Sequence, residues 1–256
     1  MKDFMVPQPA TVIAPNLPGD ADYDSAHTTG PGAIAQRRMA VLYDELAEVV
    51  AERSAAIVYA GDCLSVIGVL AGLQRRAIDP TLYWFDAHGD FHTWETTSSQ
   101  FLGGMPLAML TGRGEQTIPE HVGLTPVTDE RVVLVDARDL EPLEDVAVDR
   151  SHMTVTAVRD VATNRPAAGP IYVHIDVDVV DPQDLPAVNY PAPHGPSVRE
   201  VRDAVSQLAA TGRVVAVSVS SWNPALPGAD EAAAATRAIV DVFLDPPRLP
   251  PTMLVS

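Results

Sequence analysis

The chain has 256 residues, of which 46% are hydrophobic and 20% are charged. This is ordinary globular composition, and the length suffices for one large core. The formal net charge is −17, from 34 acidic and 17 basic residues. A chain with this much negative charge is repelled by phosphate backbones and anionic membranes. We therefore expect neither nucleic acid nor a membrane as a partner.

Cys63 is the only cysteine, which excludes an intramolecular disulfide and gives no reason to expect an oxidising compartment. No apolar run approaches the roughly 18 residues of a membrane span, and the N-terminal residues lack the pattern of a secretory signal. We therefore expect a cytoplasmic protein that forms a single domain over residues 1–256.

In chain order, short β-branched or aromatic runs alternate with alanine-rich helical stretches. The predicted strands lie within residues 55–62, 81–90, 131–139, 170–182 and 213–224. The predicted helices cover residues 34–52, 65–76, 198–211 and 230–243. Ser65 is a plausible helix cap, and Ser197 and Asp230 stand where caps for the last two helices are expected.

This alternation predicts an α/β fold, a three-layer α/β/α sandwich with a mostly parallel central sheet. Polar groups at the carboxyl ends of the strands are then expected to converge on one crevice. The proline-rich segment 182–196 follows one of these strand ends, so we interpret it as an active-site loop that proline stiffens. The sequence contains neither a GxGxxG motif after a strand nor a P-loop.

Two rows of acidic and imidazole side chains follow predicted strands. Asp86, His88 and Asp90 alternate at the end of one strand, and Asp176 and Asp178 stand two apart at the end of another. Alternation on an extended segment places side chains on one side. A single such pair is often only a solvated loop or a helix cap, but two pairs after buried strands favour a shared site for divalent cations.

Cys63 is a further candidate ligand, because it directly follows the strand predicted within residues 55–62 and precedes a helix. A helix N-terminus and a nearby metal both lower the pKa of a thiol, which would make a thiolate ligand reasonable. The alternative is a small buried apolar residue, the usual role of a lone cysteine.

These motifs together resemble the ureohydrolase (arginase/agmatinase) superfamily. The strings YAGDCLS, DAHGDFHTWETTSSQFLGGMP, HIDVDVVDPQDLPAVNYP and SSWNP follow the family pattern in order, and HTTGPGAIAQR is similar to its N-terminal segment. The resemblance implies an arginase-like fold, a small-molecule substrate, a trimer or hexamer, and two divalent metal ions, expected to be Mn²⁺. The implied metal ligands are Cys63, Asp86, His88, Asp90, Asp176 and Asp178.

In this family a metal-bridging hydroxide attacks the carbon of an amidine or guanidine and breaks a C–N bond other than a peptide bond. Three positions depart from the pattern. Cys63 replaces a histidine ligand, and a thiolate favours zinc, iron or copper over manganese. Gly103 replaces a histidine that shuttles protons, and Ser221 replaces a glutamate that pairs with the guanidinium. We therefore do not expect ordinary arginase activity.

Other positions match residues that bind an amino-acid substrate in the family. Thr97 and Ser99 match positions that bind the α-carboxylate, and Glu141 aligns with the acidic residue that meets the α-amino group. The alternative for Thr97 and Ser99 is an ordinary polar loop. His92 stands where the family has an asparagine.

The cysteine at position 63 and the loop composition resemble a subgroup that includes the Nω-hydroxy-L-arginine hydrolase of cycloserine biosynthesis. N-Hydroxylation makes a guanidine less basic, which fits the absence of the glutamate. The substrate expected from this resemblance is thus similar to Nω-hydroxy-L-arginine. Another acid or base is then needed, and the candidates are Glu95, His92 and His194, each of which also suits a surface or structural role.

Two other functions compete with this hydrolase. A catalytically degenerate homologue with a binding or assembly role would explain the three departures, but all five Asp and His ligands remain. A dinuclear phosphoesterase shares the ligand chemistry, but the two rows contain no basic group for a phosphate.

Overall fold

The computed structural model describes residues 10–13, 34–163 and 168–244. Within them, one parallel sheet has the strand order β1-β2-β7-β6-β3-β4-β5. The strands are β1 (Ala10–Ile13), β2 (Ala56–Tyr59), β3 (Thr81–Asp86), β4 (Val132–Asp136), β5 (Thr154–Thr156), β6 (Ile171–Asp176) and β7 (Val214–Ser220). The motif HTTGPGAIAQR lies mostly outside the described residues.

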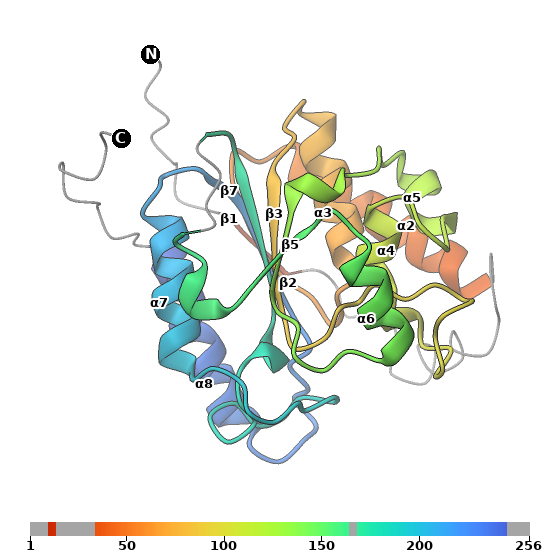
Figure 1. Ribbon diagram of the computed structural model, residues 1–256. Helices are drawn as coiled ribbons and strands as arrows, with labels where there is room; N and C mark the ends of the chain where they lie inside the picture. The colour runs from red at the N-terminus through yellow and green to blue at the C-terminus, as the bar shows by residue number, and fades with distance from the viewer. Residues whose placement is uncertain (1–9, 14–33, 164–167, 245–256) are drawn as a thin grey trace.

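Helices cover both faces of this sheet (Figure 1). One face carries α2 (Ile34–Ala51), α3 (Ser65–Arg75), α4 (Pro106–Leu110), α5 (Thr117–Val122) and α6 (Pro142–Asp149), and the other carries α7 (Val198–Ala209) and α8 (Ala229–Val240). Five short 3₁₀ helices are also described: η1 (Leu102–Gly104), η2 (Asp129–Arg131), η3 (Val158–Asp160), η4 (Val177–Val179) and η5 (Asp241–Phe243). The predicted three-layer α/β/α fold is confirmed.

The five predicted strands are those with long apolar runs, because a parallel strand between two helical layers is buried on both faces. In β3, Tyr83, Trp84 and Phe85 are all fully buried. The short strands β1 and β5 were not predicted. In β5, Thr154 and Val155 are exposed at the sheet edge, so this strand has no such run.

The predicted helices are present, with ends that differ by up to three residues, and α8 continues into η5. The cap at Ser197 is confirmed: its hydroxyl accepts from the backbone N–H of Glu200, whose carboxylate accepts from the Ser197 N–H at 2.8 Å. This reciprocal capping box fixes the start of α7.

The other two predicted caps were wrong. Ser65 lies inside α3 and donates to the Asp62 carbonyl at 2.9 Å, while the Asp62 carboxylate accepts from the Leu64 N–H at 2.9 Å. At α8 the cap is Gly228, with φ +83°, and Asp230 lies in the first turn, where its charge favours the helix dipole. A Cβ at Gly228 would lie 2.6 Å from Pro186, so the close approach of the chain excludes a side chain there.

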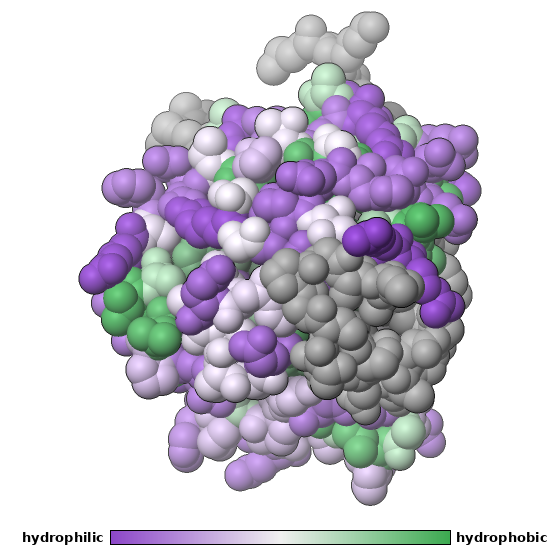
Figure 2. Space-filling model, turned by 90° about the vertical axis from the view of Figure 1, so that its right-hand side faces the viewer, coloured by the Kyte–Doolittle hydropathy of each residue, from purple (hydrophilic) through white to green (hydrophobic). Residues whose placement is uncertain are grey.

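The surface over α2 to α6 is largely hydrophilic outside the grey atoms, with hydrophobic side chains in small separate groups (Figure 2). No helix in the described ranges combines the length and the apolar character needed to cross a bilayer.

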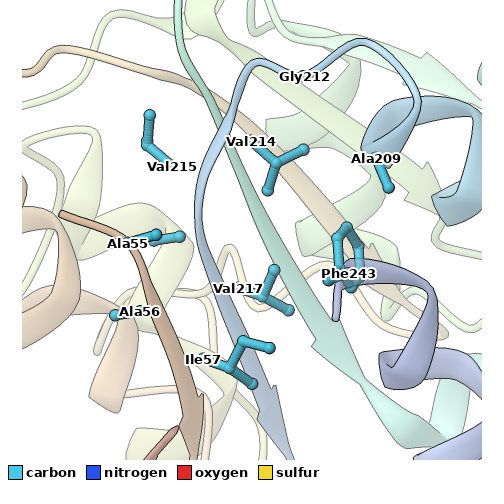
Figure 3. Close-up of a pocket in the computed structure, with 10 residues that line it drawn as sticks. Ala55, Ala56, Ile57, Ala209, Gly212, Val214, Val215, Val217 and Phe243 are labelled. Carbon is cyan, nitrogen blue, oxygen red and sulfur yellow. The ribbon is translucent and has the colours of Figure 1, made fainter. Parts of the chain in front are cut away.

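An apolar pocket lies at the amino ends of β2 and β7, where Ile57, Val214 and Val217 lie near Phe243 (Figure 3). Its lining contains none of the predicted site residues. Those residues belong to the opposite, carboxyl edge of the same parallel strands.

Candidate metal centre

The ligand positions converge because neighbouring strands end at the same edge of the sheet. Asp86 is the last residue of β3 and Asp176 is the last residue of the adjacent β6. The other ligands lie in turns rather than on extended chain, contrary to the expectation of one straight row. Asp90 has φ +49°, and Asp178 lies in η4.

Carboxylates at the strand ends organise these turns. Asp86 Oδ1 accepts from the His88 N–H at 2.8 Å, and Asp176 Oδ1 accepts from the Asp178 N–H at 3.0 Å. An aspartate that caps the backbone two residues on favours a turn over continued strand. The turns, rather than strand alternation, therefore bring the side chains together.

Two clusters of potential ligand atoms share Asp86. Cys63, Asp86 and Asp90 form one, and Asp86, His88 and Asp178 form the other, with the atoms of each cluster within 4.8 Å of one another. Asp176 lies beside the first cluster, where its Oδ2 accepts from Cys63 Sγ at 2.9 Å. All six predicted ligands are thus brought to one place, with one carboxylate positioned to serve two cations.

The electrostatics of this cluster favour a cation. Asp86, Asp90, Asp176 and Asp178 are all buried, and Asp90 Oδ2 has no hydrogen-bond partner among the described residues. Burial raises the pKa of Asp90 and of Asp176 well above the usual range, and neighbouring carboxylates raise it further. Burial and Asp86 raise the pKa of Asp178 to about 6. Buried carboxylates this close are unfavourable unless a cation compensates them, so the oxygen-rich donor set fits divalent metal ions.

His88 provides the compensating charge within the protein. Burial lowers its pKa, but hydrogen bonds to Asp178 and Asp86 outweigh that effect and raise the pKa to about 12. Its Nδ1 lies 3.3 Å from Asp86 Oδ1 and 3.3 Å from Asp178 Oδ2. The same nitrogen is therefore aimed at the carboxylates with which it would share a metal.

Cys63 is buried, and the prediction that its thiol has a lowered pKa is wrong. Burial raises the pKa of Cys63 well above its usual value, and Asp176, Asp90 and Asp86 raise it further. The helix N-terminus does not offset three nearby carboxylates. The thiol therefore donates to Asp176, and only a cation would favour the thiolate at this position.

Serine hydroxyls surround this thiol. Ser220 Oγ lies 3.2 Å from Cys63 Sγ, and Ser221 Oγ donates to Asp176 Oδ2. Ser221 has φ +73°, an unusual value for a residue with a side chain. Its neutral hydroxyl is turned toward Asp176, one of the candidate ligands.

The predicted substrate residues lie in the loop after β3 and in the loop after β4. Thr97 Oγ1 lies 3.2 Å from Ser99 Oγ, and these oxygens accept from the N–H groups of Gln100 and Phe101. Ser98 Oγ donates to Glu141 at 2.8 Å and so joins the two loops. One of the two hydroxyls donates to the other, so the pair keeps one hydroxyl hydrogen for an anionic group.

His92 is buried and lies between two glutamates. Its Nε2 is 3.5 Å from Glu141 Oε2 and 3.7 Å from Glu144 Oε2, and its Nδ1 is 3.1 Å from Thr96 Oγ1. Glu144 was not predicted, although it stands three residues after Glu141 in ARDLEPLED. It is buried and accepts from the Phe91 N–H at 2.9 Å.

The two other acid/base candidates lie at the surface. Glu95 is exposed, and a hydrogen bond from Thr93 lowers its pKa. His194 is exposed in the proline-rich loop. The structure therefore places His92, but neither of these two, beside the buried Glu144.

A family model described as the Arginase family matches residues 16–244. The chain belongs to the arginase family. An arginase of Bacillus subtilis is 30% identical over 198 residues, covering 72% of this chain and 67% of the relative. An arginase of Eremothecium gossypii is 31% identical over 186 residues, covering 66% of this chain but only 47% of the relative.

Solved arginases share the fold of this family member. The structure from Bacillus caldovelox has a TM-score of 0.76 and 25% identity, covering 84% of this chain and 78% of that one. The structure from Bacillus subtilis has a TM-score of 0.74 and 28% identity, covering 82% of this chain and 80% of that one.

Proposed function

We propose that this arginase-family protein is a hydrolase that uses two divalent cations to break a C–N bond in a guanidino or amidino compound. The observation that carries the proposal is the pair of ligand clusters that share Asp86, with the buried Oδ2 of Asp90 unpartnered among the described residues. A structural ion-pair network would satisfy such a carboxylate within the protein.

The ligands divide between two cation positions. Cys63, Asp86 and Asp90 would hold one cation, and Asp86, His88 and Asp178 the other, with Asp176 beside both. Bound divalent cations would act as Lewis acids and supply a nucleophilic water at neutral pH. We propose Mn²⁺, because oxygen and imidazole ligands outnumber the single sulfur.

The substrate we propose is an amino acid similar to Nω-hydroxy-L-arginine. Ser221 supports this choice, because a neutral hydroxyl committed to Asp176 gives no anionic partner to a strongly basic guanidinium. Thr97 and Ser99 would donate to the substrate carboxylate once their mutual hydrogen bond gives way, and Glu141 would accept from the α-amino group. Ser98 would have to release Glu141 or share it with that group.

We assign proton transfer to His92 rather than to Glu95. Gly103 has no side chain, and a Cβ on the adjacent Gly104 would lie 3.8 Å from the His92 ring. The backbone N–H of His92 also donates to the Gly104 carbonyl at 3.0 Å. The imidazole thus lies beside the backbone at which the family carries its proton-shuttling histidine. Thr96 Oγ1 lies 3.1 Å from its Nδ1, and its Nε2, which has no hydrogen-bond partner among the described residues, faces Glu141 and Glu144.

The first test is the metal content of the purified protein after Mn²⁺ supplementation, followed by assays with Nω-hydroxy-L-arginine, L-arginine and agmatine. We expect about two equivalents of metal per chain and turnover of the N-hydroxylated substrate in preference to the other two.

Asp178→Ala should lose bound metal and turnover together, whereas Asp203→Ala, on the exposed face of α7, should keep both. Turnover by metal-free protein contradicts the proposal. One equivalent or none, without turnover, supports a binding or assembly role instead.

Cys63 has its own test. Cys63→His should retain about two equivalents and bind Mn²⁺ more tightly, since imidazole is the harder ligand. Cys63→Ala should lose one equivalent. An unchanged metal content in Cys63→Ala means that the thiol only fills space beneath the site.

A further inference from the structure

Arg138 connects the metal centre to the loop at its mouth, and none of the sequence motifs singled it out. It follows β4 after two residues with left-handed backbone, Asp136 at φ +84° and Ala137 at φ +45°. Such conformations are unfavourable for residues with side chains and persist only where the surroundings enforce them. The turn directs the Arg138 side chain away from the line of β4 and toward β6 and the proline-rich loop.

Every nitrogen of the Arg138 guanidinium donates a hydrogen bond. Toward η4, Nη1 donates to the Val179 carbonyl at 2.9 Å and Nη2 to the Asp178 carbonyl at 3.2 Å. Nη1 also forms an ion pair with Asp136. Toward the loop, Nη2 donates to the Ala192 carbonyl at 2.7 Å and Nε to the Pro193 carbonyl at 3.1 Å.

The end of the loop fits closely around this guanidinium. A Cβ at Gly195 would lie 2.6 Å from Arg138 Nη2 and 2.8 Å from the backbone nitrogen of Asp181. The Gly195 N–H donates to the Asp181 carboxylate at 3.1 Å, and the Asp181 N–H donates to the Pro196 carbonyl at 2.9 Å. Only glycine permits this approach, so the guanidinium is enclosed between η4 and residues 192–196.

The same loop borders the mouth of the site. Val188 pairs with Trp222, and Asn189 Oδ1 accepts from Asn223 Nδ2 at 2.7 Å, next to Ser221. On the other side the exposed Tyr190 ring lies 5.2 Å from the ring of Phe101, in the loop that carries Thr97 and Ser99. The loops after β3, β4, β6 and β7 meet at this edge, at the bottom of Figure 1.

We propose that Arg138 couples the cation position formed by Asp86, His88 and Asp178 to the closure of the mouth loop, residues 182–196. This inference rests on the proposed function, because it assumes a cation at Asp178. A cation fixes the Asp178 carboxylate and with it the backbone of η4, whose carbonyls orient the guanidinium. The guanidinium in turn holds the carbonyls of Ala192 and Pro193. By linkage, the factor by which a bound cation favours the closed loop is also the factor by which a substrate that closes the loop tightens cation binding.

The test measures hydrogen exchange of peptides within residues 182–196, with Mn²⁺ and with EDTA, in the full-length protein. In the wild type we expect Mn²⁺ to slow exchange there about tenfold. Arg138→Met should abolish this slowing, and Arg138→Lys should restore part of it, because a lysine keeps the charge but cannot reach both sets of carbonyls at once. The matched control is Arg75→Met on α3, whose partner is Asp44, and it should behave as the wild type.

Gly195→Ala provides an independent test, because it keeps the guanidinium but forces the loop and the guanidinium apart. It should also remove the effect of Mn²⁺ on exchange and weaken binding of Mn²⁺ itself, measured by equilibrium dialysis. Equal slowing by Mn²⁺ in the wild type, Arg138→Met and Gly195→Ala overturns the coupling. A wild type that binds Mn²⁺ without any change in residues 182–196 also overturns it and leaves the proposed function intact. A wild type that binds no divalent cation overturns both.

Discussion

At the scale of single residues, Asp90 shows how a site is built at the expense of stability. Its carboxylate is buried, and one of its oxygens has no hydrogen-bond partner among the described residues. Burial raises the pKa of Asp90, and the charges of Asp86 and Asp176 raise it further. Groups arranged this way destabilise the metal-free protein and become favourable only with a cation.

Asp90→Asn tests this balance. The amide has the same shape and no charge, so we expect the variant to be more stable than the wild type in EDTA, by about 1–3 kcal/mol. It should gain less stability from Mn²⁺. Urea unfolding with EDTA and with Mn²⁺ measures both effects, and Asp203→Asn serves as an exposed control. A variant less stable than the wild type in EDTA contradicts this account of Asp90.

At the scale of elements, α2 and α3 pack closely because α3 carries glycines toward α2. A Cβ at Gly72 would lie 2.6 Å from the Ala47 carbonyl and 2.7 Å from Val50 Cβ. Gly72→Ala should therefore destabilise the protein by about 1–3 kcal/mol despite the better helix propensity of alanine. Urea unfolding checks this, with Gly61→Ala as the control, since a Cβ there meets nothing within 4 Å. Equal stability of both variants would show that the helices separate without cost.

The ion pair of Arg113 and Asp129 joins the segment after α4 to η2. Two hydrogen bonds of 2.8 Å form it, and they lower the pKa of Asp129. A carboxyl whose pKa is lowered by folding stabilises the protein above its unfolded pKa, and this contribution is lost as the pH falls through the folded pKa. Asp129→Asn should cost about 1 kcal/mol at pH 7, and this cost should disappear as the pH falls through the folded pKa of Asp129.

Urea unfolding at several pH values measures that difference. Asp79→Asn, in the more exposed pair with Arg131, is the control and should have a smaller effect. A cost for Asp129→Asn that is the same at every pH would assign it to packing rather than to charge.

At the scale of the whole molecule, the sequence predicted those features that depend on residues close together in the chain. Long β-branched runs predicted β2, β3, β4, β6 and β7, and ligand spacing predicted the residues that meet at their ends. The short edge strand β5 has no comparable run. Glu144 and Arg138 were missed because their importance arises from residues distant in the chain: Glu144 accepts from Phe91, and Arg138 binds carbonyls more than forty positions away. The thiol of Cys63 was assigned the wrong direction of pKa shift because the three carboxylates around it come from two other segments, which lie at the carboxyl ends of β3 and β6.

The whole molecule should respond to Mn²⁺ as a single folding unit if the centre binds it. A cation that binds only the folded state stabilises it by about 2.7 kcal/mol at one hundred times the dissociation constant, which for a chain of this size corresponds to a rise in Tm of roughly 5–10 °C. With a net charge of −17, any divalent cation also screens the surface. Calorimetry should therefore compare Mn²⁺ with Ca²⁺ at equal ionic strength, in the wild type and in Asp178→Ala. A rise in Tm with Mn²⁺ that Asp178→Ala loses assigns the stabilisation to the candidate centre, whereas an equal rise in both proteins assigns it to the surface.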